Sequence, residues 1–185
     1  MKLYEDFNPK DVKYEGEVGR EVKEIPGIYE YHWGAVEYNN FKTMLYDEAE
    51  KDNIKYRDLP DFLQKKREQG IEVDKYLLIK MEKHLNAAVL RLKNAVEENP
   101  KLGRAFLVLG FSYYQLQRYK EAIECFSKFI ELHPAAANTY LSVAMCYQNM
   151  KKNKEALDSI EKALKIDPDN KEAKQLADAI KNSAN

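Results

Sequence analysis

Three prolines, Pro100, Pro134 and Pro168, follow one another at intervals of 34 residues, and the residues between them repeat as well. Large apolar or small residues occupy the same six places in the two full intervals. The first set is Phe106, Leu109, Gly110, Tyr113, Ala122 and Phe126, and the second set is Tyr140, Val143, Ala144, Tyr147, Ala156 and Ile160. A fixed period of this length is typical of a chain that is built from stacked supersecondary units.

Each interval contains two amphipathic segments. In the first interval, apolar residues recur every three or four positions over 105–114 and again over 119–132, which is the period of an α-helix. The short connection 115–118 predicts an antiparallel hairpin. Gly110 and Ala122 are small enough to let the two helix backbones approach closely, and the proline ends the unit. Because one hairpin cannot bury its apolar face alone, the hairpins are expected to stack into a solenoid.

This spacing resembles the signature of the tetratricopeptide repeat (TPR) family, which has a large aromatic, Leu-Gly, Tyr, Ala, Phe and Pro at these places. The resemblance covers about residues 70–185 and is specific from about residue 102 to residue 170. It implies an all-α, TPR-like solenoid of helical hairpins that binds proteins and is not an enzyme.

The period also predicts how the last two thirds of the chain are organised. We expect a TPR-like domain over 70–185, with full repeats at 103–136 and 137–170 and a capping helix at 171–185. Residues 70–102 read as a degenerate repeat. Since no glycine or proline interrupts 74–98, this repeat is either a hairpin or one continuous helix.

Residues 1–69 form a partly irregular N-terminal region that is rich in aromatic residues. The first 70 residues hold 11 of the 21 aromatic residues, including the single tryptophan, whereas disordered linkers are poor in them. Glycines and prolines divide the first 27 residues into turns and an extended arm. Two short helices are predicted over 35–51 and 58–68, the second with Asp58 as N-cap and Pro60 in its first turn.

Composition excludes several functions. Thirty Lys and Arg against 31 Asp and Glu leave a net charge of −1, which argues against nucleic acid as a partner. No apolar run is long enough for a membrane span, and residues 1–20 lack the apolar core of a signal peptide. The expected location is therefore cytoplasmic, with a signal or anchor removed beforehand as the open alternative.

Chemically capable residues do not form a recognisable catalytic or metal site. Cys125, expected to be half-exposed, and Cys146, expected to be a small buried residue, form no Cys-x-x-Cys pair. His32, with Glu30 and Glu37 nearby in an irregular stretch, matches no acid–base or metal-ligand spacing. The sequence therefore predicts no enzyme, no cofactor and no metal.

The resemblance also implies a binding site, because in TPR proteins the first helix of each repeat lines a concave face. The corresponding residues here are Arg104, Leu107, Phe111, Tyr114, Gln115, Asn138, Leu141, Met145, Gln148 and Asn149. TPR proteins that capture chaperone C-terminal carboxylates use lysine, arginine and asparagine side chains at five defined places. Those places hold Leu107, Phe111, Ser142, Glu172 and Leu176, so a carboxylate clamp is not expected.

The predicted function is a scaffold or adaptor that holds a protein or peptide segment of apolar or aromatic character in the concave face. Two alternatives stay open. The chain's own N-terminal segment, or that of a second copy, covers the face; or the protein is a structural homo-oligomer that assembles through exchanged N-terminal arms.

Overall fold

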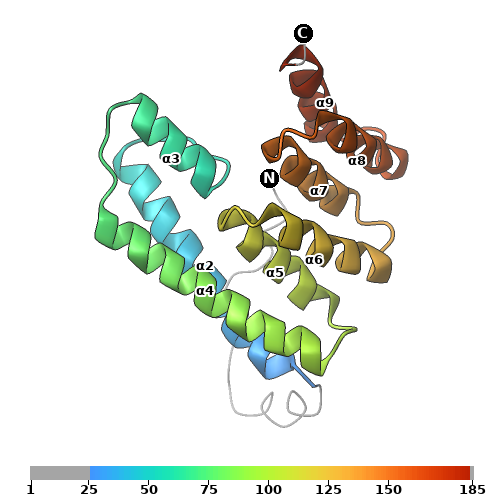
Figure 1. Cartoon of the computed structure of the whole chain (residues 1–185), viewed down its shortest axis with the longest axis horizontal. Helices are drawn as coiled ribbons and strands as arrows, with labels where there is room; N and C mark the ends of the chain where they lie inside the picture. The colour runs from blue at the N-terminus through green and yellow to red at the C-terminus, as the bar shows by residue number, and fades with distance from the viewer. Residues whose placement is uncertain (1–25, 184–185) are drawn as a thin grey trace. The chain divides into compact units, whose positions relative to one another are not determined.

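The computed structural model describes residues 26–183, and this range contains eight α-helices and no strand (Figure 1). The helices belong to two compact units that divide between Leu102 and Gly103. Unit 1 contains α2 (Ile28–Lys51), α3 (Leu59–Glu68) and α4 (Lys75–Glu98). Unit 2 contains α5 (Gly103–Gln115), α6 (Tyr119–Leu132), α7 (Ala137–Asn149), α8 (Asn153–Ile166) and α9 (Lys171–Ser183). The predicted all-α, TPR-like fold is confirmed, whereas the predicted arm before residue 26 lies outside the described residues.

Unit 2 consists of two helical hairpins and a final single helix. α5 pairs with α6, and α7 pairs with α8; α7 also packs on α6, and α9 packs on α8. The turns inside the two hairpins have the same backbone form. Gln117 and Lys151 each have a φ of 58°, and each turn closes with a 2.9 Å hydrogen bond, from the Arg118 N–H to the Tyr113 carbonyl and from the Lys152 N–H to the Tyr147 carbonyl. The repeated sequence thus folds into repeated backbone.

The glycine of the repeat lies where α5 and α6 touch. A Cβ atom on Gly110 would lie 2.6 Å from a ring carbon of Phe126, which is itself completely buried. Real Cβ atoms do not approach a neighbour so closely, so any side chain at this position must displace the ring. Gly110 therefore allows the close contact between the two helices of the hairpin.

Gly110→Leu is expected to lower the free energy of unfolding by about 1–3 kcal/mol or more, because the added side chain overpacks the contact with Phe126. Thermal or urea unfolding measures the loss. Ser127→Leu, on the exposed side of α6, is the matched control and should change stability by about 0.5 kcal/mol or less. Equal losses for the two variants would contradict the assigned helix register.

The helix α9 closes the apolar core of the second hairpin. Leu141 and Ala144 of α7, Ile160 of α8 and Ile180 of α9 belong to one buried cluster. The other side of α9 is exposed and polar, with Lys174, Gln175 and Asp178 among its residues. This arrangement is typical of a helix that caps a repeat array.

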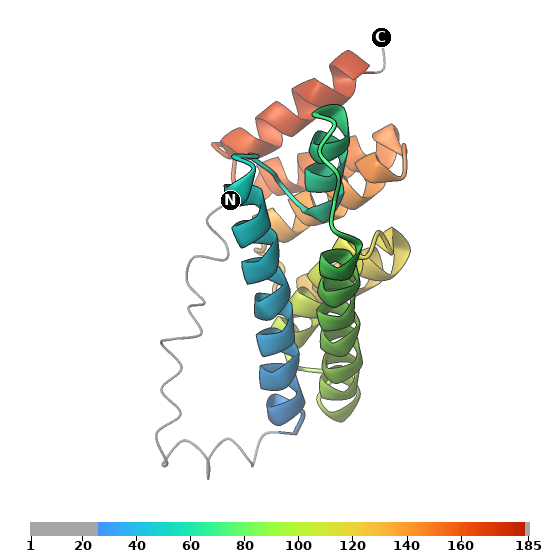
Figure 2. The ribbon, with the colours of Figure 1, turned by 90° about the vertical axis from the view of Figure 1, so that its left-hand side faces the viewer.

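Unit 1 is built on a second kind of hairpin, in which α2 and α4 lie side by side and antiparallel (Figure 2). A Cβ atom on Gly34 would lie 2.5 Å from Leu92 Cγ, so this glycine is also required by close packing. Two pairs of side chains flank the contact: Arg91 lies 3.1 Å from Glu30, and His84 Nδ1 lies 2.6 Å from Glu37.

The α2–α4 pair matches the repeat hairpin of unit 2. Gly27 and Gly34 begin and pack α2 with the same seven-residue spacing as Gly103 and Gly110 in α5. Leu92, the partner of Gly34, stands 34 residues before Phe126, the partner of Gly110. The helix α2 therefore takes the place of a first repeat helix and α4 that of a second, with residues 52–74, including α3, inserted between them.

This pairing differs from the sequence analysis, which placed the domain boundary at residues 69 and 70. Residues 75–98 form one continuous helix, and its partner is α2 rather than a helix in 70–82. The stretch around His32, expected to be irregular, is helical because α2 begins at Ile28, seven residues before the helix predicted over 35–51. Gly27, with a φ of 76°, sits at the N-cap of that longer helix.

The inserted helix α3 is attached to the C-terminal end of α2 by a buried lysine. Lys66 is 1 % exposed, and its Nζ lies 2.7 Å from Glu48 Oε1 and 2.8 Å from Asp52 Oδ2. Burial by itself would lower the pKa of Lys66, but the bonds to Asp52 and Glu48 outweigh it and raise the pKa. The hydrogen bond from Lys66 also lowers the pKa of Glu48.

Candidate functional site

The residues predicted to contact a partner lie on α5 and α7, and we call the full set of ten the first-helix surface. Their exposure divides them into three groups. Arg104 and Asn149 are exposed, and Tyr114 and Leu141 are buried at 4 %. The remaining six are half-buried: Leu107, Phe111, Gln115, Asn138, Met145 and Gln148.

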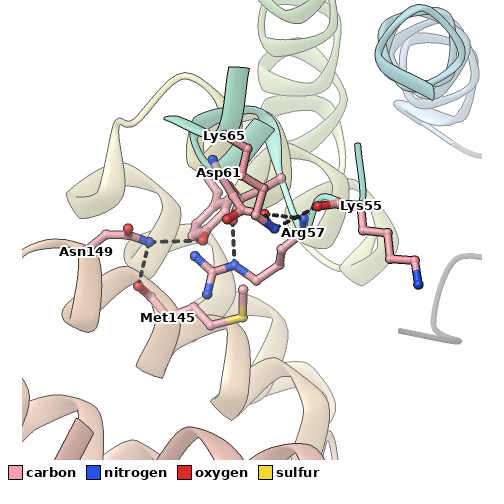
Figure 3. A network of polar contacts seen from close by, with 8 residues as sticks. Lys55, Arg57, Asp61, Lys65, Met145 and Asn149 are labelled. Carbon is pink, nitrogen blue, oxygen red and sulfur yellow. Dashed lines mark hydrogen bonds and ion pairs between the residues drawn. The ribbon is translucent and has the colours of Figure 1, made fainter. Parts of the chain in front are cut away.

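A hydrogen-bonded group joins the two first helices of unit 2. Asn149 Nδ2 on α7 donates to the Tyr114 hydroxyl on α5 at 3.0 Å and to the Met145 carbonyl at 2.9 Å (Figure 3). The Tyr114 ring also packs edge-to-face on Tyr119, with the ring centroids 5.6 Å apart. Tyr114, Met145 and Asn149 are thereby held together, and the exposed amide of Asn149 is fixed in one orientation.

Leu141 does not have the position that was expected for a contact residue. It belongs to the buried cluster that α7, α8 and α9 share, together with Ile160 and Ile180. The reason is that α9 packs on α8 and completes the core beside α7. A partner-binding residue must reach the surface, and Leu141 does not.

Asn138 serves the protein's own structure. Its Oδ1 accepts a hydrogen bond from Asn170 Nδ2 at 3.2 Å. Asn170 in turn uses its Oδ1 to accept from the Ala173 N–H at 3.0 Å, which satisfies a donor in the first turn of α9. Asn138 therefore holds the residue that caps α9.

Phe111 is anchored within its own hairpin as well. Its ring lies edge-on to Phe126, with the centroids 4.9 Å apart. Phe126 is the ring that touches Gly110, so Phe111 and Gly110 press on the same side chain. Because Phe111 is only half-buried, its position is fixed while part of its surface stays accessible.

A second group of polar contacts organises the start of α3 in unit 1. Asp58 caps the helix by accepting from the Asp61 N–H at 2.8 Å, and Asp61 accepts from the Arg57 N–H at 2.8 Å (Figure 3). Lys65 bonds to Asp61 at 2.9 Å and to the Lys55 carbonyl at 2.7 Å. Desolvation pushes the pKa of Asp61 up, but the bonds from Lys65 and Arg57 outweigh it and lower the pKa. The group closes the loop before α3.

Neither cysteine is placed for chemistry. Cys125, expected to be half-exposed, is buried at 8 %, and Cys146 is completely buried. Burial raises the pKa of each thiol to about 12, so the reactive thiolate is scarce at neutral pH. The prediction for Cys125 was wrong because its side of α6 is covered in the folded chain.

The cluster around His32 separates on the surface of α2. Glu30 pairs with Arg91, and Glu37 pairs with His84, while the ring of His32 lies 5.3 Å from that of Tyr31. Burial lowers the pKa of His32. Within residues 26–183, no three His, Cys, Asp or Glu side chains come close enough together to hold a metal ion. None of the helices in that range has an apolar stretch sufficient to cross a bilayer.

Sequence comparison places two families on this chain. A tetratricopeptide repeat family matches residues 83–137, and the family of regulator of microtubule dynamics proteins 1-3 matches residues 111–185. No curated protein sequence is detectably similar to the chain.

Solved structures with the same fold are TPR domains or similar proteins. The crystal structure of MamA is 20 % identical, with 75 % of this chain and 83 % of MamA aligned at a TM-score of 0.52. The first TPR of Spaghetti (RPAP3), bound to the HSP90 peptide SRMEEVD, is 16 % identical, with 56 % of this chain and 82 % of that chain aligned at 0.51. The Yersinia enterocolitica secretion chaperone SycD, in complex with a peptide of the translocator YopD, is 18 % identical, with 55 % and 82 % aligned at 0.50.

The structure thus explains the 34-residue period by two helical hairpins of equal geometry, and the sequence match covers the region where they begin. The packed glycines of α2 and α5 extend the same geometry to the hairpin of unit 1. Together with the TPR domains among the structural neighbours, these findings identify the chain as a member of the tetratricopeptide repeat family.

Proposed function

We propose that this protein is an interaction scaffold and that its first-helix surface binds an extended segment of a partner protein. The observation that carries the proposal is the bond between Asn149 and Tyr114. It joins residues of two successive repeats, and it leaves Asn149 Oδ1 without a hydrogen bond among the described residues. An oxygen held in that way can accept a backbone N–H of a bound segment.

The side chains around Asn149 define the chemistry of the segment. Leu107, Phe111 and Met145 are half-buried and apolar, and they lie on the same two helices as the amides of Gln115 and Gln148. Apolar contacts reward aliphatic or aromatic side chains of the ligand, and side-chain amides bond its main chain. The proposed ligand is therefore an extended segment with at least one large apolar residue.

Similar structures support peptide binding as the general role and argue for a different ligand. The RPAP3 and SycD structures that share this fold hold peptides. The positions of the carboxylate clamp have no basic side chain here when α5 is counted as its first helix. When α2 is counted first, the five positions hold Tyr31, Ala35, Val108, Asn138 and Ser142, again without a lysine or arginine. The acidic ending of an HSP90 peptide would find no cationic partner.

Selection from a library of short peptides against the full chain should yield sequences with a large apolar residue, and Asn149→Ala should weaken the selected peptides about tenfold, equivalent to about 1.4 kcal/mol. Isothermal titration measures the affinity. Lys162→Ala, an exposed change on α8, is the control and should leave the affinity unchanged. The HSP90 peptide SRMEEVD, which the RPAP3 structure contains, should not bind.

Two results would contradict the proposal. Saturable binding of SRMEEVD would show that a carboxylate is recognised by groups outside the clamp positions. Equal affinities of Asn149→Ala and Lys162→Ala for the selected peptides would place the binding site away from the first-helix surface.

A further inference from the structure

The outer side of α2 carries three large apolar residues that are exposed. Tyr29 is 62 % exposed, Trp33 is 47 % exposed and Val36 is 40 % exposed. Their spacing of four and three residues places them on one side of the helix, and the rings of Tyr29 and Trp33 lie 6.3 Å apart in an edge-to-face arrangement. We call these three residues the α2 stripe.

The repeat geometry shows what such a side of a first helix is for. Counted from the packed glycine Gly34, the residues of α7 that correspond to the α2 stripe are Thr139, Val143 and Cys146. All three are buried, at 5 %, 7 % and 0 %, and they are not part of the cluster that α7 shares with α8 and α9. The helix α7 packs on α6 in addition to α8, so this side of α7 faces the second helix of the preceding hairpin.

The corresponding residues of α9 repeat the pattern. Ala173 and Ile180 are completely buried and Ala177 is half-buried, on a helix that packs on α8. In unit 2, therefore, an amphipathic second helix covers this side of each following helix. In α2 the same side is apolar, but its residues are exposed.

The extent of the apolar residues supports a helix-sized partner. The helix α2 is longer than α5 or α7, and its repeat-equivalent part ends near residue 39. Along the same side, the residues beyond that point are the polar Asn40, Thr43 and Asp47. The apolar surface thus stops where the contact with a neighbouring repeat helix would stop.

We propose that the α2 stripe is a docking site for an amphipathic α-helix of a partner protein, whose contacting residues are small and apolar. Small contact residues follow from volume. α7 and α9 offer mostly small side chains at these places, whereas α2 offers a tyrosine and a tryptophan, so close packing requires that the partner side be correspondingly small. Tyrosine and tryptophan are also the residues that contribute most at the centre of protein interfaces.

Two other occupants fit the observations less well. The last helix of a second copy, α9, turns a polar side with Lys174 and Asp178 outwards, so head-to-tail stacking would bury charges against the α2 stripe. In the chain's own sequence, the place of a preceding second helix falls on residues 9–22. Gly16 and Gly19 there each disfavour a helix by roughly 1 kcal/mol relative to alanine.

The single tryptophan of the chain lies within the α2 stripe and reports on its coverage directly. The probe is a hydrocarbon-stapled helical peptide of 14 residues with alanine and leucine on one side, titrated into the full chain. Binding should shift the Trp33 emission to shorter wavelength in a saturable manner and protect it from acrylamide. A peptide of the same composition, with the apolar residues distributed around the helix, should do neither.

Val36→Glu places a charge in the α2 stripe and keeps the fluorescent residue, so it should weaken binding of the amphipathic peptide about tenfold or more. Leu90→Glu, which adds the same charge at a 61 % exposed position of α4, is the matched control and should bind as the wild type does.

Other results would overturn the proposal. Equal weakening in the two variants would show that the effect is one of charge and not of the site. Emission that is already blue-shifted in the full chain at every protein concentration would assign the site to the chain's own N-terminal segment. A shift that appears only with rising protein concentration, together with a dimer by light scattering, would assign it to a second copy.

Discussion

Replacing Gly27 with alanine is expected to destabilise the protein by about 2–5 kcal/mol, one of the two largest effects we predict. Gly27 has a φ of 76°, and a Cβ atom there would lie 2.3 Å from the Ala95 carbonyl oxygen. The left-handed conformation costs an L-residue about 1–2 kcal/mol, and the steric conflict adds about 1–3 kcal/mol. The conflict is with the backbone of α4, which cannot rotate away as a side chain can. Urea unfolding followed by circular dichroism measures the loss.

Gly70→Ala separates the two contributions. Gly70 has a φ of 70°, but no atom lies within 4 Å of the position of its Cβ. Its replacement should therefore cost only the conformational part, about 1–2 kcal/mol. If both variants lost the same stability, the close approach of α2 and α4 at Gly27 would be wrong.

Lys66→Met should cost about 3 kcal/mol, at the lower end of the range for breaking a buried ion pair. Methionine fills a similar volume but leaves the carboxylates of Glu48 and Asp52 without their cation. The lower end applies because the side chains of Glu48 and Asp52 keep 13 % and 24 % of their exposure. Lys65→Met, whose exposed side chain pairs with Asp61, should cost about 1 kcal/mol or less.

The dependence on pH tests the same contact with a defined sign. The folded-state pKa of Glu48 is lowered below its ordinary value of 4.5, so its contribution to stability is present above that value and is lost as the pH falls through the folded pKa. In Lys66→Met the cation is absent and burial favours the protonated acid. The stability difference between wild type and variant, measured by urea unfolding, should therefore shrink from pH 7 to pH 4. A difference that stays constant over this range would mean that the lysine acts through its volume alone.

The candidate site followed from the sequence only in part. Helical periodicity is a local property, so the sequence located the helices of unit 2 and placed ten residues on the side of α5 and α7 away from their second helices. Exposure is set by what covers a residue. Leu141 is buried because α9 completes its core, and Asn138 is occupied because it holds Asn170. The link between Tyr114 and Asn149 depends on two helices 35 residues apart and has no local pattern.

The sequence by itself determined the repeat period, the hairpins of unit 2 and the capping helix, because these rest on contacts between residues at fixed short separations. It did not determine the partner of α4. A search for a 34-residue offset cannot find α2, since the insertion of residues 52–74 moves the first helix out of register. The local pattern Trp33-Gly34, which matches the Leu-Gly of the family signature, was the available indication. Only the tertiary structure decided the pairing, because it depends on the volume at Gly34 and Leu92, two residues that lie far apart in the chain and fit one another in space.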